Sequence, residues 1–223
     1  MKTVQIKGSS EQIRVGKIVC IGQNYAAHIK EMKAEVPSSP VFFLKPTTAL
    51  IPDGGDVVLP SISRDVHHEV ELTVLIGKDG KNVSQDSAME RVAGYGVGLD
   101  MTLRDVQNDA KKKGLPWTLA KGFDTSAPVS AFVPSQQIAN PGNLTLRLNV
   151  NGTTRQQSGT NDLIFSVDKL IAYISQFITL EQGDIIFTGT PQGVAQVKPG
   201  DKLEASLSDP TGTVLASLSV HIR

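Results

Sequence analysis

The chain has 223 residues, of which 39% are hydrophobic and 20% charged, so it can bury the core of an ordinary globular protein. Its 22 basic and 22 acidic residues give a formal net charge of zero, which argues against a nucleic-acid-binding protein. The single cysteine, Cys20, excludes an intrachain disulfide, and no stretch approaches the ~20 apolar residues that span a bilayer. We therefore expect a cytoplasmic protein in which residues 1–223 form one domain and Cys20 is buried as a small apolar side chain.

Apolar runs bounded by Gly, Pro or polar residues predict that most of the regular structure consists of strands. In chain order these strands are expected at residues 17–22, 41–44, 69–76, 94–102, 144–150, 153–157, 184–187, 202–207 and 213–220. Between two of them, Asn151-Gly152 is a strong signal for a tight hairpin turn.

Helical patterns are fewer. A short helix is expected within residues 24–33, and a polar helix at residues 104–113 that stops at Gly114. Residues 167–178 are amphipathic at helical spacing, and the apolar side consists of Leu170, Ile171, Ile174, Phe177 and Ile178. Because regular helices do not separate the strands, a parallel doubly wound sheet is disfavoured, and we expect a mixed, mostly β fold with a few helices (α+β).

Two acidic side chains in one predicted strand give the strongest chemical signal. In the segment His67-His68-Glu69-Val70-Glu71-Leu72, Glu69 and Glu71 face the same way and lie ~7 Å apart along the strand. Such carboxylates repel each other, and a shared Mg²⁺ or Mn²⁺ removes this penalty, whereas the alternative is a solvated face with two acids by chance. Asp100, at the end of the glycine-rich run 94–99, favours the metal site because it supplies a third oxygen ligand.

A histidine and a glutamate share one face of the first predicted helix. At i and i+3, His28 and Glu31 can form a hydrogen bond. A carboxylate beside an imidazole is the arrangement of a general base, although an exposed pair without function is the alternative that this spacing leaves open.

A turn rich in Gly, Thr and Pro, Thr188-Gly189-Thr190-Pro191-Gln192-Gly193, follows the predicted strand 184–187. Its backbone N–H groups and the Thr190 hydroxyl are suited to bind a carboxylate, although a tight connection after a strand has the same composition. At the start of the predicted polar helix, Arg104 and Asp105 are interpreted as a structural ion pair or helix-start charges.

In their order along the chain, several motifs resemble the fumarylacetoacetate hydrolase family, from about residue 17 to the C-terminus. They are Gly22-Gln23-Asn24-Tyr25-Ala26-Ala27-His28, Phe43-Leu44-Lys45-Pro46, His67-His68-Glu69-Val70-Glu71-Leu72, Leu99-Asp100-Met101-Thr102-Leu103-Arg104-Asp105-Val106-Gln107, Trp117-Thr118-Leu119-Ala120-Lys121-Gly122-Phe123-Asp124 and Thr188-Gly189-Thr190-Pro191-Gln192-Gly193-Val194. Within this family, the chain is similar to the short, single-domain branch that includes acylpyruvate hydrolases and oxaloacetate decarboxylases.

The resemblance implies that the fold is a mixed β-roll of the family's C-terminal-domain type. It also implies that the protein assembles as a homodimer. It also implies that Glu69, Glu71 and Asp100 are ligands of Mg²⁺ or Mn²⁺, which Ca²⁺ can replace in a crystal. By the same resemblance, His28 and Glu31 are a pair that activates water.

Further roles follow from the resemblance alone. Lys121 matches a catalytic lysine near the metal and the substrate, and Gln107 and Thr190 match positions that hold a 2-oxo acid. Residues 23–40 match a mobile lid that closes over the site.

These roles favour a hydrolase that cleaves a C–C bond in small 2,4-dioxo acids (acylpyruvates) through a metal-stabilised enolate. Oxaloacetate decarboxylation and oxaloacetate keto–enol tautomerisation share this enolate and stay open as alternatives. Two departures from the family pattern are Gln23, where relatives often have Arg that can contact an anionic substrate, and Ala195, where they often have Gly. A metal-binding module without catalysis is less favoured, and so is a zinc hydrolase using His67 and His68, since adjacent histidines on a strand face opposite ways.

Overall fold

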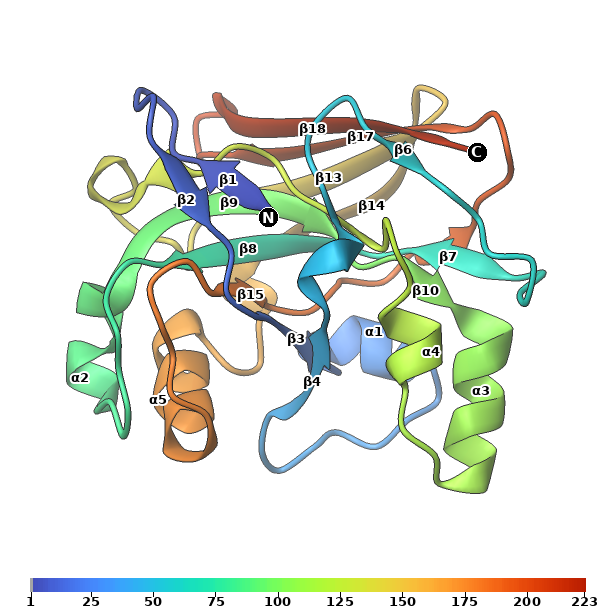
Figure 1. The fold of residues 1–223 in the computed structure, drawn as a ribbon, viewed down its shortest axis with the longest axis horizontal. Coiled ribbons are helices and arrows are strands. Elements are labelled where there is room, and N and C mark those ends of the chain that lie inside the picture. Colours follow the sequence, from blue (N-terminus) through green and yellow to red (C-terminus); the bar gives the residue numbers. More distant parts are fainter. Residues whose placement is uncertain (1) are drawn as a thin grey trace.

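Alternating apolar residues build two β-sheets that lie face to face in the computed structural model, which describes residues 2–223 (Figure 1). One sheet has six strands and the other has five, and the helices lie on the outer side of the six-stranded sheet. Within residues 2–223, no helix has both the length and the apolar composition needed to cross a membrane.

The six-stranded sheet contains the strands from which the candidate site is built. Its order is β12 (Val133–Pro134), β9 (Val92–Leu99), β8 (Val70–Ile76), β15 (Ile185–Phe187), β3 (Ile18–Gly22) and β4 (Val41–Lys45). Neighbouring strands are antiparallel, except that β15 and β3 are parallel. This arrangement confirms the expected mixed, mostly β fold. Cys20 is fully buried in β3, as expected.

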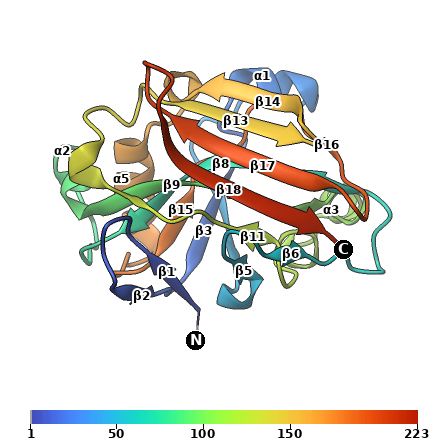
Figure 2. The ribbon, with the colours of Figure 1, turned by 90° about the horizontal axis from the view of Figure 1, so that it is seen from above.

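The five-stranded sheet lies across the first (Figure 2). Its order is β14 (Thr153–Gly159), β13 (Thr145–Val150), β17 (Lys202–Ser208), β18 (Val214–Ile222) and β6 (Asp56–Val57). The first two strands form the predicted hairpin. At its turn Asn151 and Gly152 have φ values of 51° and 78°, the left-handed conformation that a two-residue hairpin turn of this type requires.

The apolar faces of the two sheets meet in one core. The side chains that β8 contributes are Val70, Leu72, Val74 and Ile76, and those that the other sheet contributes include Leu146, Leu148, Leu203, Leu207, Leu218 and Val220. Because side chains alternate along a strand, Glu71 lies on the opposite face of β8, toward the helices. The alternation predicted from the sequence is therefore confirmed.

Three short sheets join these layers. They are β1 (Thr3–Gln5) with β2 (Gln12–Arg14), β10 (Thr102–Leu103) with β7 (Val66–His68) and β16 (Ala195–Gln196), and β11 (Ala127–Pro128) with β5 (Leu50–Ile51). None of these strands was predicted separately, because two or three residues are too few to show a periodic pattern.

The helices are α1 (Ala26–Glu31), α2 (Gln85–Ala88), α3 (Arg104–Lys113), α4 (Thr118–Lys121) and α5 (Val167–Phe177). Short 3₁₀ helices occupy η1 (Thr47–Ala49), η2 (Met89–Arg91), η3 (Ser135–Gln137) and η4 (Thr160–Asp162). The polar helix has its predicted bounds and ends at Gly114 with a φ of 64°. On the predicted apolar side of α5, Leu170, Ile171 and Ile174 are buried, Ile178 just after the helix is half-buried, and Phe177 at its end is 59% exposed.

Candidate metal centre and active site

Three buried carboxylates meet where β8 and β9 run side by side. The antiparallel register pairs Glu71 with Gly98, so Glu69, just before β8, lies opposite Asp100, just after β9. The carboxylate oxygens of the three acidic residues lie within 4.8 Å of one another, and each residue is at most 4% exposed. The structure thus brings together all three predicted metal ligands.

Three cationic side chains surround these carboxylates. Lys121 Nζ donates to Glu69 and to Asp100, both at 2.7 Å. Arg104 forms an ion pair with Glu69, and Lys45 Nζ lies 2.8 Å from an Asp100 oxygen. All three cations are buried, so the loss of either member of a pair leaves an uncompensated charge away from water.

The charges fix the protonation of Lys121 and Glu69. Burial alone would lower the pKa of Lys121, but the charges of Asp100 and Glu69 outweigh burial and raise it. Burial would likewise raise the pKa of Glu69, but the charges of Lys121 and Arg104 hold it well below its usual range. At neutral pH the pair is therefore an ammonium and a carboxylate.

Glu71 is the carboxylate that lacks a cationic partner. Its side chain accepts a hydrogen bond from the Gly189 N–H at 2.7 Å, and no salt bridge to it occurs within residues 2–223. Burial, reinforced by the charges of Asp100 and Glu69, raises the pKa of Glu71 well above its usual range.

The donor set fits a divalent cation. It consists of three carboxylates, the hard oxygen ligands that Mg²⁺ and Mn²⁺ prefer. Asp100 Oδ1 forms an ion pair with Lys45 Nζ, whereas Glu71 has no cationic side chain beside it. A divalent cation held by Glu69, Glu71 and Asp100 would supply the positive charge that Glu71 lacks.

Two of the surrounding cations were not predicted as site residues. Arg104 and Asp105 lie in the first turn of α3, as predicted, but they do not form the predicted ion pair with each other. Arg104 turns back from the start of α3 to Glu69, whereas Asp105 accepts from the Ser63 hydroxyl at 2.6 Å. Lys45 appeared only within a family motif, although it is 2% exposed and ends the strand β4 beside Asp100.

The predicted histidine–glutamate pair forms on α1. His28 Nδ1 lies 3.0 Å from Glu31 Oε2, and the Gly193 N–H donates to the same carboxylate at 3.1 Å. Because Nδ1 faces a carboxylate, Nδ1 carries the proton of the neutral imidazole and Nε2 is left as the basic nitrogen. His28 lines the same pocket as Glu69 and is 7% exposed.

That pocket gathers most of the predicted site residues. Its lining includes His28, Glu69, Glu71, Gln107, Lys121 and Thr190, and also Gln23, Arg104 and Lys111. The space between them is about 40 Å³, which accommodates one or two water molecules. A four-carbon acid is larger than this space.

Two groups in the pocket are free to donate hydrogen bonds. Gln107 Oε1 accepts from Arg104 at 2.7 Å, and its amide NH₂ has no acceptor among residues 2–223. The Thr190 hydroxyl donates to the Val70 carbonyl at 2.9 Å, whereas the Thr190 backbone N–H has no acceptor within the described chain.

The two adjacent histidines, His67 and His68, form hydrogen bonds with residues outside the carboxylate cluster. His67 Nε2 lies 2.8 Å from Asp65, and the buried His68 places Nδ1 2.9 Å from Gln156. Burial lowers the pKa of both imidazoles, so both are neutral at pH 7. Within residues 2–223, the one group of three or more potential metal ligands consists of Glu69, Glu71 and Asp100. The structure therefore offers no ligand set for the zinc alternative.

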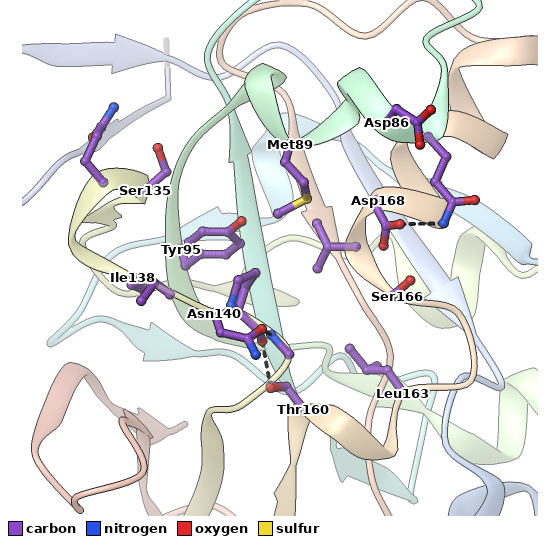
Figure 3. Close-up of a pocket in the computed structure, with 16 residues that line it drawn as sticks. Asp86, Met89, Tyr95, Ser135, Ile138, Asn140, Thr160, Leu163, Ser166 and Asp168 are labelled. Carbon is purple, nitrogen blue, oxygen red and sulfur yellow. Dashed lines mark hydrogen bonds between the residues drawn. The ribbon is translucent and has the colours of Figure 1, made fainter.

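A larger cavity of about 630 Å³ lies beside α2 and the start of α5 (Figure 3). Tyr95 and Met89 line it together with Asp86 and Asp168, and its lining contains no cationic side chain. A 2-oxo acid is an anion and would meet acidic groups there. The chemistry of the lining, and not the size of the cavity, therefore identifies the carboxylate cluster as the candidate active site.

Comparison with known proteins identifies the family of this chain. Residues 17–221 match the fumarylacetoacetate (FAA) hydrolase C-terminal family. The mitochondrial oxaloacetate tautomerase FAHD1 of Bos taurus is 55% identical over 190 residues, which cover 85% of this chain and 86% of that protein. The oxaloacetate tautomerase YcgM of Escherichia coli (strain K12) is 50% identical over 190 residues, which cover 85% of this chain and 87% of that protein.

Among solved structures, the crystal structure of fumarylpyruvate hydrolase from Pseudomonas aeruginosa, in complex with Mn²⁺ and pyruvate, is similar to this one. The TM-score is 0.93 at 38% sequence identity, and the match covers 99% of this chain and 95% of that chain.

Proposed function

Because the chain belongs to the fumarylacetoacetate hydrolase C-terminal family, we propose that it is a metal-dependent enzyme that interconverts the enol and keto forms of oxaloacetate. Relatives that are 55% and 50% identical to it are named oxaloacetate tautomerases. These names support the substrate, and the charges of the site support it independently.

The charge of the pocket is the observation that carries this proposal. The three buried carboxylates are matched by three buried cations, Lys121, Arg104 and Lys45. A divalent cation at the carboxylates would therefore leave the site with a net positive charge suited to a dianion. Oxaloacetate is a dianion at neutral pH, whereas acetylpyruvate has a single carboxylate. Lys111, which lines the same pocket, adds a further positive charge.

The free donors of the pocket are suited to hold the substrate. The Gln107 amide NH₂ and the Thr190 backbone N–H can each donate to a carboxylate oxygen. Both roles agree with the roles that the family resemblance implies for these positions.

Tautomerisation moves one proton between the enol oxygen and C3 of oxaloacetate. His28 Nε2 takes the proton from one of these atoms and returns it to the other, while Glu31 stabilises the imidazolium that forms in between. Lys121 stays protonated throughout and stabilises the negative charge of the enolate. When bound, a divalent cation supplies the Lewis acid that polarises the 2-oxo group.

Hydrolysis of acylpyruvates, the activity expected first from the sequence, is the second candidate. The pairing of His28 with Glu31 favours it, because this pair can take a proton from water as the water oxygen attacks the distal carbonyl. The C–C bond then breaks to give a carboxylic acid and the enolate of pyruvate, which takes the proton. Decarboxylation of oxaloacetate reaches the same enolate by loss of CO₂ and needs no attacking water.

Mg²⁺ or Mn²⁺ is the proposed cofactor, and a similar solved structure holds Mn²⁺. We also propose that residues 23–40 act as a lid, since this segment includes α1 and with it His28, which lines a pocket smaller than the substrate.

A homodimer is proposed as the assembly. The edge strand β4 of the six-stranded sheet leaves Val41 and Leu44 39% and 46% exposed, and Leu115, which lines the same shallow groove, is 54% exposed. Apolar side chains beside an unpaired strand edge favour contact with the same surface of a second copy. Light scattering on the purified protein tests this, and a monomer at micromolar concentration would contradict it.

The reaction is tested by NMR with oxaloacetate and with acetylpyruvate as substrates. Either Mg²⁺ is present, or Mn²⁺ at a concentration low enough to keep the signals resolved. Faster enol–keto exchange of oxaloacetate, without formation of pyruvate, supports the tautomerase. Formation of pyruvate and CO₂ from oxaloacetate identifies a decarboxylase, and formation of acetate and pyruvate from acetylpyruvate identifies the hydrolase. Exchange no faster than in buffer refutes the first proposal.

A further inference from the structure

Gln156 on β14 is the one buried residue of a strand whose other residues are exposed or half-buried. It is 1% exposed, and its side chain reaches from the five-stranded sheet to the segments that form the candidate site. No motif in the sequence assigned a role to it.

The amide of Gln156 makes four hydrogen bonds, the full number available to a glutamine side chain. Its oxygen accepts from the Val70 N–H at 3.0 Å and from His68 Nδ1 at 2.9 Å. Its nitrogen donates to Thr190 Oγ1 and to the Pro191 carbonyl, both at 2.9 Å. The backbone donor at one end and the backbone acceptor at the other leave one orientation for the amide.

Both ends of this amide bind segments that carry site residues. The oxygen binds the strand at the residue between Glu69 and Glu71. The nitrogen binds the loop 188–193, whose backbone N–H groups also hold Glu71 and Glu31. One buried side chain therefore links the carboxylate cluster, the loop and, through Glu31, the catalytic pair on α1.

The same bonds determine what Thr190 offers to a substrate. Its hydroxyl hydrogen is donated to the Val70 carbonyl, and its oxygen accepts from Gln156. With its only hydroxyl hydrogen committed, Thr190 retains its backbone N–H as the group that can donate to a carboxylate.

We propose that Gln156 is a positioning residue that locks the loop 188–193 against β8, so that Thr190 binds the substrate through its backbone N–H and not through its hydroxyl. This inference rests on the proposed 2-oxo acid site, since it names how that site holds a carboxylate.

Three variants test it. Gln156→Met keeps the length of the side chain but loses all four hydrogen bonds, and Gln156→Glu keeps the acceptors while it loses the donors to the loop. Gln157→Met is the matched control, because Gln157 is the next residue of the same strand, exposed, and bonded only to Arg147 across the hairpin at 3.0 Å. Changes of residues that orient an active site cost about 10- to 100-fold, and we expect both Gln156 variants to raise KM by that factor with a smaller change in kcat.

A second readout needs neither metal nor turnover. Hydrogen exchange of the peptide that covers residues 188–193, measured by mass spectrometry on the metal-free protein, is expected to accelerate in both Gln156 variants and not in Gln157→Met. If wild-type exchange and wild-type KM persist in Gln156→Met, or if the control behaves like it, Gln156 has no positioning role.

The Thr190→Val variant separates the two donors of Thr190. It removes the hydroxyl and keeps the N–H, so KM should rise less than in Gln156→Met. A larger rise, without faster exchange of the loop, would show that the hydroxyl binds the substrate and would overturn the proposal. If oxaloacetate is not the substrate, the affinity for pyruvate replaces KM as the readout. Binding of pyruvate to the Mn²⁺-loaded protein is then measured by the broadening of its methyl signal in the NMR spectrum. A failure of the proposed function is then distinct from a failure of this inference.

Discussion

Glu69 and Glu71 lie side by side in the proposed metal site, but they are held by different partners. Glu69 forms buried ion pairs with Arg104 and Lys121, whereas Glu71 accepts one backbone hydrogen bond and pairs with no cationic side chain in residues 2–223. Neutralising each carboxylate should therefore change the stability of the metal-free protein in opposite directions, while either change should abolish metal binding.

The magnitudes follow from these partners. Glu69→Gln leaves the buried Arg104 without a counter-charge and leaves Lys121 with Asp100 alone, and removal of one partner from a buried ion pair costs about 3–5 kcal/mol. In a protein of this size each kcal/mol shifts Tm by about 2–4 °C, so we expect Tm to fall by roughly 6–20 °C. Glu71→Gln keeps an oxygen for the Gly189 N–H and removes a carboxyl group whose ionisation is disfavoured by burial and by two neighbouring carboxylates, and we expect it to stabilise the metal-free protein by about 1–3 kcal/mol.

Differential scanning calorimetry with EDTA and with Mn²⁺ measures both effects. Wild-type protein in Mn²⁺ at 100 times its Kd should gain about 2.7 kcal/mol, and both variants should lose this gain. Glu204→Gln is the control, since Glu204 pairs with Lys202 on the surface and should leave both values unchanged. If Glu71→Gln lowers Tm in EDTA as much as Glu69→Gln does, or if it keeps the Mn²⁺ shift, the assignment of partners is wrong.

Three other predictions concern the same site. Lys121→Met removes the cation shared by Glu69 and Asp100, so turnover should fall ~10²-fold or more, while Mn²⁺ should bind at least as tightly as in the wild type. Weaker Mn²⁺ binding, measured by electron paramagnetic resonance, would contradict this. Burial and the neighbouring carboxylates raise the pKa of Glu71, so the metal-free protein should lose stability, and Mn²⁺ affinity should rise, as pH increases through that raised pKa. Mn²⁺ binding should displace the proton that the carboxyl group of Glu71 holds below its raised pKa. Titration calorimetry in buffers of different ionisation enthalpy should detect this released proton, and an Mn²⁺ affinity that does not depend on pH would refute the release. Gly189→Ala places a Cβ atom 2.7 Å from Asn24 Cβ at a φ of 103°, so we expect a lower Tm and weaker Mn²⁺ binding, and wild-type values for both would contradict the packing.

Much of the fold was predictable because its signals are local. The alternation that places Glu71 opposite the apolar core of β8 is visible in the sequence, and so are the Asn151-Gly152 turn and the bounds of α3. The strands of the three short sheets were not predictable, since their hydrogen bonds come from partners distant in sequence. Phe177 has the correct helical spacing but is the last residue of α5 and stays 59% exposed, although its ring packs beside Phe42 and Tyr173.

The site was predictable where acidic residues follow the strand pattern and less so where cations enter from other elements. Glu69, Glu71 and Asp100 follow from two strands, and their register brings them together. A lysine or arginine is normally expected on the surface, so the burial of Lys45 and Arg104 beside these acids depends on tertiary partners.

Gln156 shows the same limit more clearly, because it lies in an exposed hairpin strand beside Gln157, and only the structure distinguishes the two side chains.

The most direct test of the account is the rate of enol–keto exchange of oxaloacetate with metal removed and then restored. Loss of the ultraviolet absorbance of the enol should accelerate with Mn²⁺ or Mg²⁺, return to the buffer rate in EDTA, and recover when the cation is added back. Glu71→Gln should stay at the buffer rate throughout although it remains folded. Exchange that is unaffected by EDTA, or full activity of Glu71→Gln, would contradict a metal-dependent reaction at Glu69, Glu71 and Asp100.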